Sequence, residues 1–136
     1  MSMVHKVDYY QVQVPHDVGE AFRILSDLRG AGVGLLACCG FPVGGGKAQI
    51  ELVPKHHESF RKAAAKLDLQ PSERERAFLI QGGNRVVAVD EAIETLAKHG
   101  VNILAFQAVS AGSGTWGMML RVEPADYERA CEALGF

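Results

Sequence analysis

Gly32-Val33-Gly34-Leu35-Leu36-Ala37 in the first half of the chain is matched by Gly100-Val101-Asn102-Ile103-Leu104-Ala105 in the second, an offset of 68 residues (100 minus 32). The apolar residues ahead of the two stretches share one spacing: Val18, Ala21, Leu25 and Leu28, then Val86, Val89, Ile93 and Leu96. After the hairpin that follows, the halves align at an offset of 70, which pairs Phe60 with Ala130 (130 minus 60). An internal repeat of this length predicts two similar structural units whose pseudo-symmetry carries the function.

Each half predicts the order strand, helix, strand, strand, helix. Alternating apolar residues from Tyr9 to Pro15 are typical of a strand, and Arg76 to Gly82 is its counterpart. The spacing i, i+3, i+7 and i+10 places one apolar stripe on each first helix, which ends at Gly30 or Gly32 and at Gly100. A hairpin and a second helix complete each half. The hairpin strands are predicted at Val33 to Phe41, Lys47 to Val53, Val101 to Ser110 and Thr115 to Val122.

This order is that of the ferredoxin-like βαββαβ unit with its last strand short or absent. We therefore predict an α+β protein of two tandem ferredoxin-like βαββα(β) units, residues 1–72 and 73–136, with antiparallel sheets and the helices packed on one face. Only Leu69 to Arg74, which includes Pro71, is left for a fourth strand of the first unit. The first strand of each unit is then an open edge, so we expect the two sheets to join or a second chain to cover them.

The composition argues against two classes of partner. The 136 residues include 14 basic and 16 acidic side chains, a net charge of −2 with neutral histidines. Binding to nucleic acid or to anionic lipid lacks its usual electrostatic driving force, so we expect neither partner. Charged residues, glycine or proline interrupt every apolar run before about 20 residues, so no membrane-spanning helix is predicted. Three cysteines without a disulfide framework or a signal sequence favour the reducing cytoplasm.

The second half resembles an ACT domain, the small-molecule regulatory module of amino-acid metabolism. The resemblance rests on Gly100-Val101-Asn102-Ile103-Leu104, preceded by a helix and by the turn Gly83-Asn84-Arg85-Val86. In the first half, Asp17-Val18-Gly19 is similar to the acidic-residue-to-glycine segment that opens the family's first helix. Two tandem copies cover nearly the whole chain. The resemblance implies a stand-alone tandem ACT protein, a homodimer, that binds an amino acid or a related effector.

The family binds its effectors where the first strand, the first helix and the neighbouring unit's second strand meet. The residues that the resemblance selects for this junction are His16, Asp17, Val18, Gly19, Gly34, Leu35, Asn84, Arg85, Val86, Asn102 and Ile103. A helix N-terminus offers N–H groups to a carboxylate, and Arg85 can hold it with two hydrogen bonds. Asn102 can donate and accept hydrogen bonds, and Asp17 can pair with an ammonium group. Together these groups suit a zwitterion.

The two halves differ at the residues that matter most. Gly34 stands where the second half has Asn102, and Asp17 stands where it has Arg85. We therefore predict that the two sites are chemically unequal. Either one repeat binds while the other only packs, or a composite site takes Asp17 from one unit and Asn102 from the other. Polar turn residues also serve as local caps, so His16 and Arg85 have a purely structural interpretation as well.

The remaining motifs indicate no metal, cofactor or catalytic site. Cys38 and Cys39 are adjacent on a predicted strand, where successive side chains face opposite sides, so they cannot chelate one ion together. His56 and His57 lie about 100° apart on a helix, and no spacing typical of zinc ligands is present. The run Gly44-Gly45-Gly46-Lys47 lacks the following hydroxyl residue and helix of a phosphate loop. No Ser/His/Asp, Cys/His or paired-carboxylate set predicts catalysis.

The sequence thus predicts a regulatory protein that binds a small molecule, an amino acid, and has no enzyme activity. Two alternatives stay open, because this architecture hosts many unrelated functions. One is a structural or oligomerisation module that binds a partner protein through its open edges. The other is a small thiol-dependent enzyme that uses Cys38, Cys39 or Cys131. Trp116 is interpreted as packing on the sheet face or anchoring an interface.

Overall fold

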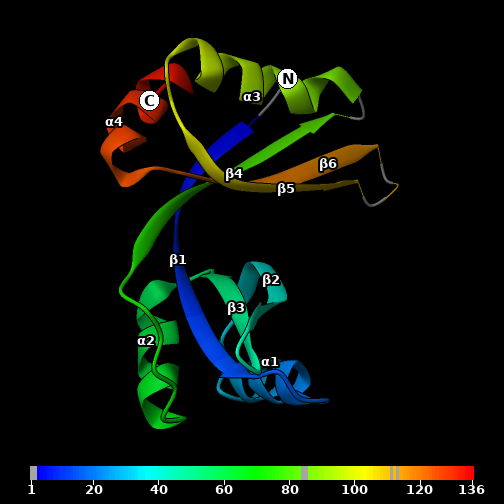
Figure 1. Ribbon diagram of the computed structural model, residues 1–136, viewed down its shortest axis with the longest axis vertical. Helices are drawn as coiled ribbons and strands as arrows, with labels where there is room; N and C mark the ends of the chain where they lie inside the picture. The colour runs from blue at the N-terminus through cyan, green and yellow to red at the C-terminus, as the bar shows by residue number, and fades with distance from the viewer. Residues whose placement is uncertain (1–2, 84–85, 111, 113) are drawn as a thin grey trace. The chain divides into compact units, whose positions relative to one another are not determined.

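The computed structural model describes residues 3–83, 86–110, 112 and 114–136, with residues 86–89 described as helix backbone only. The elements in chain order (Figure 1) are β1 (Met3–Pro15), α1 (Glu20–Gly30), β2 (Leu35–Gly44), β3 (Lys47–Pro54), α2 (His57–Lys66), β4 (Glu75–Gly83), α3 (Val86–Lys98), β5 (Ile103–Ser110), β6 (Thr115–Val122), the short 3-10 helix η1 (Pro124–Asp126) and α4 (Tyr127–Ala133). The predicted order of strand, helix, strand, strand, helix occurs twice. Neighbouring strands in each hairpin are antiparallel, so the predicted α+β ferredoxin-like fold class is confirmed. Among the described residues, no helix is both long and apolar enough to span a membrane.

The two compact units interleave along the sequence. One, here called the first-repeat unit, is Asp8–Glu75; the other, the second-repeat unit, combines Met1–Val7 with Arg76–Phe136. This division differs from the predicted ranges 1–72 and 73–136 because β1 begins at Met3 rather than Tyr9. A strand of 13 residues is about twice the usual length, so its first part can belong to one unit and its remainder to the other.

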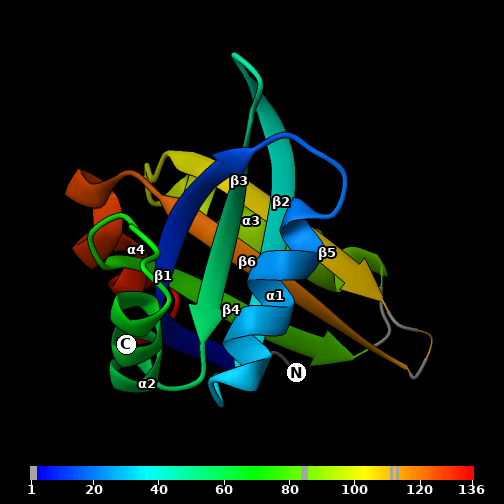
Figure 2. The ribbon, with the colours of Figure 1, turned by 90° about the horizontal axis from the view of Figure 1, so that it is seen from below.

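The first-repeat unit has the strand order β2-β3-β1, with β3 antiparallel to both neighbours. The predicted inward face of β1 is confirmed. Figure 2 shows both helices on one face of the three strands. The buried core residues come from β1, β3, both helices and the connection between α1 and β2: Tyr10, Val12, Val14, Ile24, Leu28, Val33, Ile50, Leu52, Phe60, Ala63 and Ala64. The Tyr10 ring stacks on Phe60 with 4.6 Å between ring centroids, which seats α2 on β1.

A short extended segment, residues 70–75, covers the edge of β1 in this unit. The Ser72 N–H donates to the Gln11 carbonyl oxygen (2.8 Å), and the Gln11 N–H donates to Ser72 Oγ (3.0 Å). The Tyr9 hydroxyl donates to Glu75 Oε2 (2.5 Å). Pro71 has no N–H to contribute to a ladder, so local hydrogen bonds take the place of a full fourth strand.

The second-repeat unit places β4 between β1 and β6, with β5 beyond β6. The N-terminal part of β1 therefore pairs with the edge of β4, which the sequence had left open. Val4 from this part packs against the core of the unit. Figure 1 shows α3 and α4 on one face of β4, β5 and β6. The buried core residues are Phe78, Ile80, Leu96, Val101, Trp116, Met118, Leu120, Val122, Tyr127, Ala130 and Cys131.

The register of the repeat differs from the predicted one only in the last helices. Tyr10 pairs with Leu52, and Phe78 pairs with Leu120, so the offset of 68 continues through the hairpins (120 minus 52). Tyr127 stacks on Phe78 at 5.2 Å, as Phe60 stacks on Tyr10, which gives an offset of 67 in the last helices (127 minus 60).

The predicted offset of 70, which paired Phe60 with Ala130, is therefore wrong. The two prolines that stand at this offset, Pro54 and Pro124 (124 minus 54), occupy different structural positions. The structure places Pro54 at the end of a strand and Pro124 at the start of η1. Proline is tolerated at both kinds of position, so it is a poor marker of register.

The predicted apolar stripe of the first helix also needs correction. Gly19 has a φ of +88° and immediately precedes α1, so Val18 lies in the turn and is fully exposed. Ala21 is exposed as well, whereas Leu28 of the predicted stripe is buried and Leu25 is partly buried; Ile24 is the buried residue that the stripe lacked. The sequence spacing extended the helical period across a turn where the backbone is left-handed.

Candidate functional site

The turn between β1 and α1 borders a hollow of about 400 Å³ in the first-repeat unit, here called the α1 hollow. The turn contributes His16, Asp17 and Gly19, three of the residues selected from the sequence. The rest of the lining comes from the end of β1, the first turn of α1, and the facing parts of β2 and β3: Val14, Pro15, Glu20, Ala21, Phe22, Gly40, Phe41, Pro42, Ala48, Gln49 and Ile50.

Local backbone geometry explains why the turn opens here. The His16 N–H donates to the Gly46 carbonyl oxygen (2.8 Å), which ties the end of β1 to the hairpin turn. Gly19 then takes the N-terminal cap position of α1, and no side-chain hydrogen bond caps the helix. The Glu20 N–H donates to the Asp17 carbonyl oxygen (3.3 Å), and the N–H groups that follow it in the first turn of α1 lie at the positive end of the helix dipole.

The walls of the α1 hollow combine apolar and acidic groups. Phe22 is 72% exposed and Phe41 is 38% exposed, so both rings present apolar surface to solvent. Glu20 Oε2 accepts a hydrogen bond from Arg23 Nη2 (2.8 Å), and this contact raises the pKa of Arg23. The arginine therefore remains charged and orients the Glu20 carboxylate. Asp17 is exposed in the turn itself.

The predicted residues at the start of the second strand are not part of this hollow. Strands β1 and β2 both pair with β3, with Pro15 and Gly44 both opposite Lys47 and Leu35 opposite Pro54. Gly34 and Leu35 therefore lie at the opposite end of the unit from Asp17. One unit alone does not assemble the whole predicted set.

In the second-repeat unit, Asn102 has a local structural role through its backbone. Its N–H donates to Asp126 Oδ2 (3.0 Å), and its carbonyl oxygen accepts from the Glu123 N–H (3.1 Å). Arg129 Nη1 donates both to Asp126 Oδ1 (3.2 Å) and to the Gly100 carbonyl oxygen (3.0 Å). This network ties the start of β5 to η1 and α4. Ile103 is half-buried and packs against the core of the unit.

Three of the predicted residues, Asn84, Arg85 and Val86, directly follow β4 in the sequence. Asn84 and Arg85 lie outside the described residues. Val86 is the first residue of α3, and its side chain is likewise outside the description. The predicted roles of these three residues stay predictions.

The second-repeat unit has its own hollow, of about 510 Å³, at the equivalent place. The offset of 68 relates its lining residues Gly82, Gly83, Val109, Trp116 and Gly117 to Val14, Pro15, Phe41, Ala48 and Gln49 of the α1 hollow. Trp116 is 6% exposed, and its Nε1 has no hydrogen-bond partner among the described residues. A Cβ atom at position 82 would lie 2.6 Å from the Trp116 ring, so Gly82 makes room for the indole.

Trp116 therefore packs on the sheet, as expected, and fills space that Ala48 leaves open in the first repeat. The sequence analysis did not find the Gly82–Trp116 contact. Its only signal was a glycine inside a predicted strand, which often marks a close approach.

Metal-binding and thiol groups are dispersed. Over residues 3–83, 86–110, 112 and 114–136, no three His, Cys, Asp or Glu side chains gather in a way that would hold a metal ion. Cys38 is exposed, Cys39 is half-buried and Cys131 is buried, and all three are free thiols.

No family model and no curated protein matches the sequence. Solved structures do match it. Protein BT0572 from Bacteroides thetaiotaomicron is similar over 98% of this chain and 88% of its own, with a TM-score of 0.80 and 15% identity. The ligand-free regulatory subunit of aspartate kinase from Thermus thermophilus is similar over 98% and 93%, with a TM-score of 0.65 and 13% identity. The regulatory subunit of aspartate kinase from Thermus flavus is similar over 98% of this chain and 94% of its own, with a TM-score of 0.62 and 15% identity.

The chain has an ACT-like fold. At these identities the likeness concerns the fold, and the function has to be argued from the sites.

Proposed function

We propose that this ACT-like protein binds a small effector, an amino acid, in the α1 hollow and acts as a regulatory protein without catalysis of its own. The observation that carries the proposal is the meeting of His16, Asp17 and Gly19 with two exposed aromatic rings around one hollow of about 400 Å³. Volumes of this order are typical of sites for small ligands. The likeness to regulatory subunits of aspartate kinase supports the regulatory part. The signal would pass to a partner protein or to a change of assembly.

The groups around the hollow match a zwitterion. The carboxylates of Asp17 and Glu20 are partners for an ammonium group, and the N-terminus of α1 is a partner for a carboxylate. The rings of Phe22 and Phe41 offer apolar contact to the side chain of the effector. His16 adds a ring nitrogen that can donate or accept a hydrogen bond.

The unequal repeats favour binding in the first one. The equivalent hollow in the second-repeat unit contains the Trp116 indole, and its lining has no charged side chain among the described residues. Among the described residues, a zwitterion therefore finds no charged side-chain partner there. Of the two alternatives left open by the sequence, this supports the one in which one repeat binds while the other only packs.

The test is calorimetric titration of the full chain with each of the twenty amino acids. We expect one selective ligand, and we expect Asp17→Asn to weaken its binding about tenfold or more because a charge-assisted hydrogen bond is lost. Phe41→Ala should weaken ligands with apolar side chains. Glu132→Gln is the matched control, since it removes an exposed carboxylate from the other unit. Unchanged affinity in Asp17→Asn, or no binding at millimolar concentrations, contradicts the proposal.

A specific observation also favours the alternative of an assembly module. Apolar side chains are exposed along β2 and β5, the outermost strands of their units: Leu36, Phe41, Val43, Leu104, Phe106 and Val109. Exposed apolar surface beside an unpaired strand edge is typical of an association surface. As a second candidate function we propose homodimerisation through these strands. Light scattering should show a dimer that Phe106→Ser dissociates and that the control Gln107→Ser leaves intact.

A further inference from the structure

A groove of about 560 Å³ lies in the first-repeat unit between α2 and the segment that leads into β4, here called the α2 groove. It shares no residue with the α1 hollow. Its charged lining consists of Arg61, Arg74 and Glu73, so two guanidinium groups face one carboxylate. The remaining lining is apolar apart from two hydroxyl groups: Tyr10, Ala64, Ala65, Leu69, Pro71 and Ser72.

The two arginines are held only loosely by acidic neighbours. Arg74 Nε lies 3.8 Å from Asp8 Oδ1, and Arg61 Nη1 lies 3.8 Å from Glu58 Oε1. Both distances exceed the hydrogen-bond range of about 2.7–3.2 Å. Because a guanidinium group carries five N–H donors, each arginine keeps donors for a further acceptor. The Arg61 and Arg74 side chains are 65% and 52% exposed, so a ligand can reach them.

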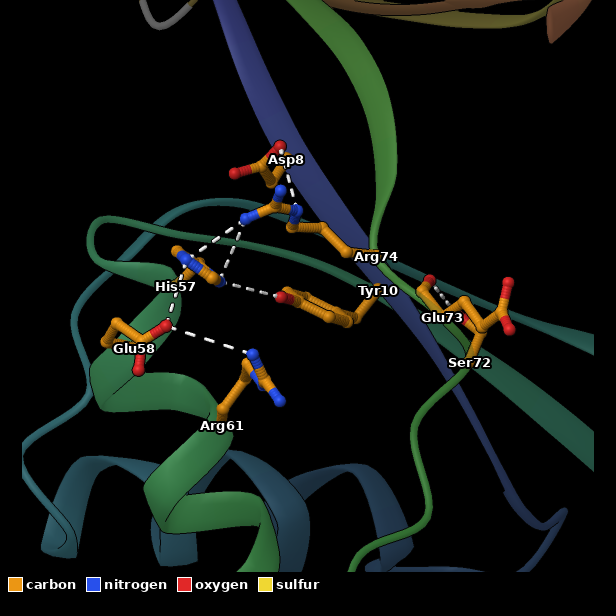
Figure 3. Close-up of polar contacts among 8 residues, drawn as sticks. All are labelled: Asp8, Tyr10, His57, Glu58, Arg61, Ser72, Glu73 and Arg74. Carbon is orange, nitrogen blue, oxygen red and sulfur yellow. Dashed lines mark hydrogen bonds and ion pairs between the residues drawn. The ribbon is translucent and has the colours of Figure 1, made fainter.

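A hydrogen-bonded cluster positions one of these arginines beside the Tyr10 hydroxyl. Arg74 Nη1 lies 3.1 Å from His57 Nε2, and the Tyr10 hydroxyl lies 3.2 Å from His57 Nδ1. Figure 3 shows Arg74 and Arg61 on either side of Tyr10, one from the segment before β4 and the other from α2. Burial raises the pKa of Tyr10, so its hydroxyl keeps its proton. The donors are thus arranged before any ligand arrives, which lowers the entropy cost of binding.

We propose that the α2 groove binds an amphipathic anion, with a phosphate or carboxylate group held by the guanidinium groups of Arg61 and Arg74 and an apolar body against Ala64, Leu69 and Pro71. Planar guanidinium groups suit both oxyanions. The half-buried Leu69 and Pro71 and the buried Ala64 give the apolar body a surface that it removes from water. The groove is a second ligand site in the same unit, separate from the effector site proposed above.

The test is an NMR titration of the full ¹⁵N-labelled chain with phenyl phosphate and, separately, with 3-phenylpropionate. We expect saturable shifts of the Leu69–Arg74 amides and of the Arg61 and Arg74 side-chain N–H signals with at least one of the two anions. The anion that binds identifies the headgroup. Inorganic phosphate should bind about tenfold more weakly than phenyl phosphate, and neutral benzyl alcohol should cause no saturable shift.

Variants of the two arginines test whether binding in the α2 groove causes these NMR shifts. Arg61→Gln and Arg74→Gln should each weaken binding about tenfold, because each removes one charged partner of the anion. Arg23→Gln is the matched control, since it removes an exposed arginine of α1 in the same unit. Asp17→Asn, which tests the α1 hollow, should leave this titration unchanged, so the two proposals fail separately. The chemical-shift dispersion of each variant shows that it is folded.

Three results would overturn the proposal. The first is no saturable shift with either anion up to about 20 mM, well above the affinities of specific small-ligand sites. The second is equal weakening by Arg23→Gln and by the two groove variants, which would indicate general attraction to positive charge. The third is equal affinity for inorganic phosphate and phenyl phosphate, because the apolar lining would then contribute nothing.

Discussion

At the scale of single residues, Gly82 decides how the second hollow is filled. It lies directly under the Trp116 ring, at a distance that leaves no room for a Cβ atom. We predict that Gly82→Ala lowers the free energy of unfolding by about 1–3 kcal/mol, because the indole must leave its position in the core. The measurement is urea denaturation followed by fluorescence of Trp116, the single tryptophan of the chain.

Gly117→Ala is the matched control for this prediction. Gly117 lies next to Trp116 in β6, and open space surrounds the position of its missing Cβ. We expect Gly117→Ala to change the free energy of unfolding by no more than about 0.5 kcal/mol, as is usual for surface substitutions. Equal stability of the two variants would contradict the steric role of Gly82.

Tyr127 makes the free energy of unfolding of the second-repeat unit change with pH in the alkaline range. Burial, followed by the hydrogen bond with Cys131, raises its pKa to about 12, while an unfolded tyrosine has a pKa of about 10. The unfolded chain therefore releases this proton first. The contribution is complete below pH 10 and is lost as the pH rises toward about 12, by up to about 1.4 kcal/mol per pH unit.

Tyr127→Phe should remove this pH dependence and keep the stacking on Phe78. The measurement compares urea denaturation of the two proteins at pH 8 and pH 11. We predict that the difference in unfolding free energy between wild type and variant shifts in favour of the variant at pH 11. Parallel curves would show that burial does not perturb this hydroxyl.

At the scale of elements, the segment of residues 70–75 takes the place of a fourth strand beside β1. Ser72 makes two hydrogen bonds to the backbone of Gln11, one through its N–H and one through Oγ. We predict that Ser72→Ala costs about 1 kcal/mol, the typical contribution of one such bond. Hydrogen exchange of the Gln11 amide should become faster. Ser59→Ala on the exposed face of α2 is the control and should leave this exchange unchanged.

The elements also explain which sequence signals were reliable. Alternation in β1 predicted the buried face of Tyr10, Val12 and Val14 correctly, because a strand exposes alternate residues to the same face. The helical period failed at Val18, because nothing in the spacing shows that the backbone turns at Gly19 before α1 begins. Patterns report the interior of an element better than its ends.

At the scale of the whole molecule, the N-terminal residues complete the unit formed by the C-terminal half. Val4 packs against its core, and the Lys6 ammonium lies 4.8 Å from the centroid of the Phe136 ring. We predict that Val4→Asp destabilises the second-repeat unit by about 1–3 kcal/mol, because it places a charge against an apolar core. Hydrogen exchange should become faster in β4 and β6 and change less in β3.

His5→Asp is the matched control, because His5 is the exposed neighbour of Val4 on the same strand. It should leave the exchange of β4 unchanged. If Val4→Asp instead affected β3 as much as β4, the assignment of residues 1–7 to the second-repeat unit would be contradicted.

The candidate sites were only partly predictable from the sequence, because residues distant in the sequence form them. The turn residues His16, Asp17 and Gly19 were selected by the resemblance to the ACT family, and they line the α1 hollow. Phe22 and Phe41 were missed, since an apolar residue on a helix or strand is ordinarily a core residue. Arg61 and Arg74 were missed because 13 residues and a chain reversal separate them before they reach one groove (74 minus 61).

The sequence by itself determined the repeat, the order of the elements, the inward face of β1 and the turn that opens α1, because periodicity and turn chemistry act between near neighbours. Only the tertiary structure decided that β1 contributes to both units, that Trp116 lies on Gly82, and that Arg61 and Arg74 line a groove beside Tyr10. These features join residues that are distant in the sequence. Strand pairing and side-chain packing bring such residues together, and neither leaves a local pattern in the chain.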